Sequence, residues 1–117
     1  MESKEMARII IDAMEEKKAE DIRVLDIAEV SSLGDYFIIA SGNNVNQVQA
    51  ITDEIDMRLG RAGVAPRQIE GYMNANWILM DYGDVIVHVF DKENRLFYDL
   101  ERIWKDGKSV DADSLKK

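Results

Sequence analysis

Residues 75–90 read ANWILMDYGDVIVHVF, in which two apolar runs flank Gly83-Asp84. Each run is rich in β-branched and aromatic residues, and the two residues between them favour a tight turn, so the stretch predicts a β-hairpin. If the loop holds two residues, Tyr82 pairs with Val85 and the rest of the register follows. The paired residues are then Met80 with Val87, Leu79 with His88, Ile78 with Val89 and Trp77 with Phe90.

The two faces of this hairpin differ in composition, because side chains alternate along a strand. The first face is apolar throughout and is expected to lie under helices; it carries Ile78, Met80, Tyr82, Val85, Val87 and Val89. The second face adds one acid and one imidazole to aromatic and aliphatic residues; it carries Trp77, Leu79, Asp81, Ile86, His88 and Phe90. The acid and the imidazole are unusual in a core, and the adjacent aromatic and aliphatic residues are unusual on a solvent-exposed surface. The second face is therefore predicted to be a surface that becomes buried when a partner binds.

An alternative for the second face is a sheet that helices cover on both sides. In that case His88 is a core histidine whose hydrogen bonds are satisfied. The assignment also depends on the loop length, since a shift of one residue would exchange the two faces.

The rest of the chain predicts helices and strands on both sides of the hairpin in sequence. Apolar residues recur at helical spacing over residues 3–19 and 44–62. Asn43 or Asn44 can cap the second helix, and Gly63 is placed to end it. The predicted strands are 23–30, 36–41 and, at a sheet edge, 67–72, and one or two short helices are predicted in 93–104.

This order of elements predicts an α/β (α+β) fold with one domain over residues 1–106. The β-sheet has to be mixed, because the strand before the long helix cannot be joined by a tight turn to the strand that follows it. Helices are expected mainly on one face, which leaves the other face largely uncovered. Residues 107–117 are polar and predict a flexible C-terminal tail.

The composition of the chain narrows the classes of function. There is no cysteine among the 117 residues, which excludes disulfides and cysteine zinc sites and fits a reducing cytoplasm. No apolar run approaches the roughly 20 residues that a membrane helix needs, and the N-terminus lacks a signal-peptide pattern. The net charge of −8 disfavours direct nucleic-acid binding and favours a basic partner protein.

A catalytic site is difficult to build from these residues. Asp81 and His88 share the second face, but one carboxylate and one imidazole are too few for a hydrolytic zinc site. No cysteine is present, and no serine is evidently paired with His88 as a nucleophile. The Ser41-Gly42 turn could hold a phosphate, as in nucleotidyltransferases, but no neighbouring strand offers the acid pair that holds magnesium. We therefore predict no catalytic residue, metal or cofactor, with a nucleotidyltransferase-like enzyme as the alternative.

Five segments together resemble the ribosomal silencing factor family, also called Iojap-like. They are DYFIIASG (35–42), QVQAITDEI (47–55), EGY (70–72), WILMDYGDVIVHVF (77–90) and FYDLERIW (97–104), and the resemblance spans residues 3–106. It implies a nucleotidyltransferase-like fold that lacks the metal-binding acids, and a protein that is not an enzyme. It also implies binding to ribosomal protein L-fourteen on the large ribosomal subunit, which blocks joining of the small subunit and lowers translation when nutrients run short. Free members are expected to be homodimers.

The second face of the hairpin is the predicted binding surface for this partner. The expected buried anchors are Trp77, Leu79, Ile86 and Phe90. The acids expected to meet Lys or Arg on the partner are Glu70, Asp81 and Asp84. His88 is expected to add a hydrogen bond and to titrate near neutral pH, with Tyr36 and Tyr82 at the margin. Two alternatives stay open: the same face forms the homodimer, or the chain is a scaffold module for another basic partner.

Overall fold

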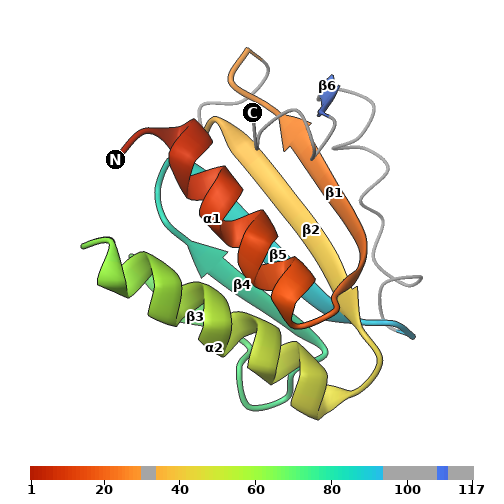
Figure 1. Ribbon diagram of the computed structural model, residues 1–117. Coiled ribbons are helices and arrows are strands. Elements are labelled where there is room, and N and C mark those ends of the chain that lie inside the picture. The colour runs from red at the N-terminus through yellow and green to blue at the C-terminus, as the bar shows by residue number, and fades with distance from the viewer. Residues whose placement is uncertain (30–33, 94–107, 111–117) are drawn as a thin grey trace.

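The hairpin forms with the register that the sequence predicts. The computed structural model describes residues 1–29, 34–93 and 108–110, and in it strand β4 (Trp77–Asp81) pairs antiparallel with β5 (Val85–Asp91) (Figure 1). At the turn, the Tyr82 N–H donates to the Val85 carbonyl at 3.0 Å. The pairs along the ladder are Trp77 with Phe90, Ile78 with Val89, Leu79 with His88 and Met80 with Val87.

Strand β5 also joins the hairpin to the first half of the chain. Its other side pairs in parallel with β2 (Tyr36–Gly42), and β2 pairs antiparallel with β1 (Glu20–Asp26). The edge strands are β3 (Gln68–Glu70), beside β4, and β6 (Lys108–Val110), beside β1. The sheet order is β3-β4-β5-β2-β1-β6, so the predicted mixed sheet and the predicted edge strand after Pro66 are confirmed.

The two helices of the described residues, α1 (Ser3–Glu16) and α2 (Val45–Arg61), lie side by side on one face of the sheet (Figure 1). The Asn44 side chain caps α2, because its Oδ1 accepts the Gln47 N–H at 2.9 Å. Gly63 follows the helix with φ +85°, the left-handed conformation that ends helices. The Gln47 side chain also donates to the carbonyls of Lys17 and Lys18, at 3.1 and 3.0 Å, and so ties α2 to the end of α1.

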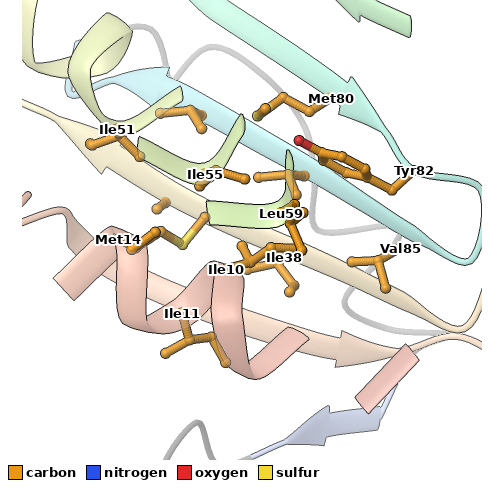
Figure 2. Packing of buried hydrophobic residues seen from close by; sticks show 14 of the residues in the cluster. Ile10, Ile11, Met14, Ile38, Ile51, Ile55, Leu59, Met80, Tyr82 and Val85 are labelled. Carbon is orange, nitrogen blue, oxygen red and sulfur yellow. The ribbon is translucent and has the colours of Figure 1, made fainter. Parts of the chain in front are cut away.

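The core lies between these helices and the first face of the hairpin (Figure 2). Ile10 and Met14 of α1 and Leu59 of α2 are fully buried there, against Ile38 and Met80 of the sheet. Burial of such side chains contributes about 1.5–3 kcal/mol each, so this layer is the main source of stability. The expectation that helices cover the apolar face of the hairpin is confirmed.

Strand β1 differs in its limits from the strand predicted over 23–30. It begins at Glu20, with a bulge between Glu20 and Arg23 where Asp21 has φ +51°. It ends at Asp26, whose carboxylate accepts the Ala28 N–H at 3.1 Å and turns the chain out of the sheet. Local turn chemistry therefore set the end of this strand, while apolar composition suggested a longer one.

Residues 108–110 depart from the predicted flexible tail. They pair with Asp26, Leu25 and Val24 of β1, and Val110 packs against the main core. Without this pairing, the outer edge of β1 would present unpaired N–H and C=O groups, and local composition does not reveal that opportunity. The remaining tail residues, and residues 94–104 of the predicted short helices, lie outside the described residues.

Truncating Leu59 tests the assignment of the core. Leu59→Ala removes a fully buried side chain between α2 and the sheet, and we expect the free energy of unfolding to fall by about 2–5 kcal/mol in urea denaturation. Met57→Ala on the same helix is the matched control, because Met57 is 41% exposed and its truncation should change stability by no more than about 0.5 kcal/mol. Equal losses for the two variants would contradict the placement of the core.

Candidate partner-binding face

The second face of the hairpin continues across the sheet on the side away from α1 and α2. Strand pairing aligns Glu70 of β3 with Leu79 of β4, Leu79 with His88 of β5, and His88 with Ile39 of β2. This register brings the predicted residues of β4 and β5 together with the predicted acid of β3. We use the name hairpin face for Glu70, Trp77, Leu79, Asp81, Ile86, His88 and Phe90.

Exposure of the hairpin face falls from the sheet edge inward. Glu70 is exposed, Trp77 and Leu79 are half-buried, and His88 and Phe90 are 5% and 0% exposed. Asp81 and Ile86 are half-buried as well. A partner can therefore touch the β3–β4 side of the face directly.

The expectation of a largely uncovered sheet face is wrong at its centre. Ile39 and Phe90 are fully buried and form a second core cluster with Phe37, against which Trp77 and Ile86 pack. Phe90 was predicted as an anchor that contacts the partner, but it supports the face from within. The parallel pairing with β2 places apolar residues beside those of β5 on this side of the sheet, and the two strands share this second cluster.

An aromatic cluster occupies the middle of the hairpin face. The Trp77 ring stacks on Phe90 with centroids 5.3 Å apart, and Phe37 meets the His88 ring edge-on at 5.2 Å. The Trp77 indole Nε1–H donates to His88 Nδ1 at 3.0 Å. His88 therefore makes its hydrogen bond within the face, whereas the sequence predicted one to the partner.

The expected titration of His88 near neutral pH is also corrected. Burial lowers the pKa of His88 to about 4, because the charged imidazolium would lose its hydration there. Its Nε2 has no hydrogen-bond partner among the described residues. At neutral pH the ring is thus a neutral acceptor for Trp77, and the alternative of a buried histidine describes it better than a surface switch.

The turn holds the acidic end of the hairpin in one conformation. Gly83 has φ +86° and donates its N–H to the Asp81 carboxylate at 2.7 Å. A Cβ added to Gly83 would lie 3.2 Å from the guanidinium carbon of Arg67, so a larger residue would be strained and crowded there. Asp81 thus uses one carboxylate oxygen in the turn, while the exposed Asp84 and Glu70 side chains face solvent.

Tyr36 and Tyr82 do not belong to the hairpin face. Both pack into the core on the helix side, where Tyr82 is 7% exposed near Leu59 (Figure 2). Burial is the largest cause that raises the pKa of each phenol, followed by Asp26 and Asp35 for Tyr36 and by Asp56 for Tyr82. Their predicted marginal contacts with a partner are therefore corrected, because strand alternation turns both side chains to the other side of the sheet.

Ser41 and Gly42, predicted as a turn, are the last two residues of β2 and lie just before α2. Ser41 is buried, and a Cβ on Gly42 would lie 3.0 Å from Val48 Cγ2, which closes the space in front of the helix. The Gln47 side chain accepts the Asn43 N–H at 2.6 Å, so side chains of the chain itself already cap this end. Among residues 1–29, 34–93 and 108–110, no group of three potential metal ligands occurs, and no helix is long and apolar enough to span a membrane.

Two neighbours of the hairpin face were missed in the sequence. Gln68 pairs with Asp81 at the exposed edge, and its amide donates to Glu70. Phe37 reaches the same side of the sheet through β2. Period-two alternation along residues 67–72 and 36–41 could have assigned each residue to a face, but the pairing between strands is nonlocal and has no local signal.

In the described residues, the fold is a two-layer α+β arrangement whose β3–β4 side combines acidic side chains with the Trp77 indole. The family model described as "Ribosomal silencing factor during starvation" matches residues 1–117. The chain belongs to the ribosomal silencing factor family, as the resemblance predicted.

Individual relatives agree with this assignment. "Ribosomal silencing factor RsfS" of Bacillus subtilis is 42% identical over 113 residues, which cover 97% of this chain and 96% of the relative. The protein of the same name from Halalkalibacterium halodurans is 37% identical over 115 residues, covering 98% of both chains. A crystal structure of a Chromobacterium violaceum protein superimposes with a TM-score of 0.86 at 37% identity, covering 92% of this chain and 90% of that one.

The family carries a regulatory role rather than a catalytic one. Membership implies association with the large ribosomal subunit and silencing of translation. The predicted fold class is confirmed by the structural match.

The buried imidazole predicts a pH dependence of stability. The folded-state pKa of His88, about 4, lies below the ordinary value of 6.5. Between pH 4 and pH 6.5 the imidazole is therefore protonated in the unfolded chain and neutral in the folded chain. Stability should therefore fall as the pH drops from 6.5 to 4, by about 3 kcal/mol from this residue. His88→Asn should lose that part of the pH slope in urea denaturation. Equal slopes for variant and wild type would contradict the buried neutral state.

Proposed function

We propose that this chain represses translation by binding ribosomal protein L-fourteen on the large subunit, where its bulk blocks joining of the small subunit when nutrients are limiting. It acts in the cytoplasm and needs no catalytic group. The observation that carries the proposal is the family match along the whole chain, whose description names both silencing and starvation. The mechanism is steric, so its strength depends on how long the chain stays bound.

The hairpin face is the surface that we propose for this contact. Trp77 and Leu79 are half-buried, so each leaves apolar surface for a partner while the sheet holds the rest of the side chain. Aromatic residues held in this way are frequent hot spots, because little side-chain entropy is lost when they bind. The buried Phe90 and His88 pack beneath this surface and hold the Trp77 side chain in a fixed position.

Charge supports the choice of a basic protein as the partner. The exposed Glu70 and Asp84 lie beside the apolar part of the face, and the chain carries a net charge of −8. An acidic surface is attracted by Lys and Arg of a ribosomal protein and repelled by RNA phosphates. Binding is therefore directed to a protein patch on the subunit rather than to the surrounding RNA.

The same face is our proposed contact in a homodimer of the free chain. Half-buried apolar residues at a sheet edge suit a contact that forms and dissociates. If both contacts use Leu79, one copy cannot dimerise and bind the ribosome at once. Dimerisation would then compete with silencing.

Charge reversal tests the face on the ribosome. Asp84→Lys should weaken binding to isolated large subunits by about tenfold in co-sedimentation, mainly through slower association, with a smaller loss at high salt. Glu16→Lys is the matched control, because it makes the same charge change at an exposed position at the end of α1 and should bind within about twofold of wild type. Equal losses would mean that net charge, and not this face, governs binding.

Leu79 tests whether dimer and ribosome contacts overlap. We expect Leu79→Arg to be monomeric in sedimentation velocity and to bind neither large subunits nor purified ribosomal protein L-fourteen, because the charge cannot be buried in an apolar contact. A cooperative thermal melt checks that the variant is folded. A folded variant that still binds the subunit would reject the hairpin face as the silencing surface.

A further inference from the structure

We propose that His88 is a positioning residue: its neutral imidazole fixes the Trp77 indole in the orientation in which the hairpin face binds its partner. The role rests on the proposed function, since it is the presentation of Trp77 to a partner that His88 serves. This role accounts for the imidazole of the single histidine in the chain. Core packing does not require an imidazole at this position, and the buried ring cannot contact a partner directly.

The backbone of Trp77 is already held. Trp77 pairs with Phe90, and the Gly71 backbone, at φ +83°, passes so close to the Trp77 carbonyl that any side chain at position 71 would collide with it. The rotation of the indole about its own side-chain bonds has to be fixed as well. Stacking on Phe90 restricts the tilt of the ring but does not choose which edge carries the N–H outward.

The hydrogen bond to His88 makes that choice. His88 pairs with Leu79, so it is a diagonal neighbour of Trp77 on the same side of the sheet, and the two rings lie 5.8 Å apart at 32°. The indole N–H can only donate, and at 3.0 Å it donates to His88 Nδ1. The N–H edge of the indole is thus turned toward His88, and the half-buried side chain still exposes part of its apolar surface.

The imidazole is itself locked by its surroundings. Phe37 packs edge-on against it and Phe90 lies parallel to it, with centroids 6.3 Å apart. The residues opposite His88 on the adjacent strands, Leu79 and Ile39, are apolar. Of the charged groups on this side of the sheet, the Asp81 carboxylate accepts from Gly83 and the Arg23 guanidinium pairs with Asp21.

This arrangement requires one protonation state. Because Nδ1 accepts, the ring proton must sit on Nε2, which has no partner among the described residues and is buried. A leucine would fill the same space without leaving a buried polar atom, so hydrophobic packing alone does not account for an imidazole here. Holding the Trp77 N–H is the interaction that a leucine could not replace.

NMR of the nitrogen-labelled protein tests the bond directly. The chain has one histidine, so its ring signals are unambiguous, and Trp104→Phe identifies the Trp77 indole signal by elimination. We expect scalar coupling between Trp77 Nε1 and His88 Nδ1, with the ring proton on Nε2. A ring proton on Nδ1, or the absence of coupling, would overturn the proposal.

Two substitutions of His88 separate positioning from packing. In His88→Asn the amide oxygen stands where Nδ1 stood and can still accept from Trp77, so binding to large subunits should stay within about threefold of wild type. His88→Leu keeps the volume but removes the acceptor, and we expect binding about tenfold weaker with a cooperative thermal melt retained. Wild-type binding by His88→Leu would overturn the proposal.

A double-mutant cycle with Trp77→Phe completes the test, because phenylalanine has no N–H to position. If His88 acts through the indole, His88→Leu causes no further loss of binding in the Trp77→Phe chain. Additive losses would mean that His88 acts independently, which overturns the proposal but leaves the proposed function standing. If the wild-type chain does not bind large subunits at all, the proposed function fails and this role for His88 fails with it.

Discussion

The Gly83-Asp84 turn is the constraint on which the sheet and its proposed binding face depend. It sets the register of β4 against β5, and a one-residue slip would send every side chain of the hairpin to the wrong face. The turn also reaches the other half of the chain, since the Asp84 carbonyl accepts the N–H groups of Asp35 and Tyr36 at 2.6 and 3.2 Å. These bonds place the start of β2 beside the start of β5, and the parallel ladder continues from there. One short turn therefore aligns three strands.

Local signals in the sequence were sufficient to place α1, α2 and strands β2 to β5 and to set the hairpin register. Alternation and turn chemistry act within a few residues, and the helix ends at Asn44 and Gly63 follow from capping rules that are equally local. The depth of each side chain was less predictable. Phe90 is buried in a cluster that β5 shares with β2, His88 is buried against Phe37 of that cluster, and β6 pairs with the outer edge of β1. Such facts depend on contacts between distant segments.

The difference between local signals and contacts of distant segments also explains which residues of the candidate site were predicted correctly. Composition indicated a surface that combines acids with aromatic residues, and the β3–β4 side of the face has this character. It could not separate residues that touch a partner from residues that support them, which is why Phe90 and His88 change roles. Tyr82 could have been assigned correctly, because the alternation that defined the two faces already places it with Met80 on the helix side. In the proposed role such support is useful, because a fixed surface loses less entropy when it binds.

Within the part of the chain that the structure describes, the two edges of the sheet, β3 and β6, each consist of three residues. A strand edge presents unpaired N–H and C=O groups that can recruit the edge of another molecule, and the risk grows with the length of the edge. The long, apolar strands β2 and β5, which would form the most persistent cross-β contacts, lie in the interior of the sheet order. The proposed partner-binding face can thus be apolar without the sheet offering neighbouring copies a backbone template for aggregation. Side chains on one face of the sheet would make the contact with a partner, while the short edge strands limit pairing of the backbone with other molecules.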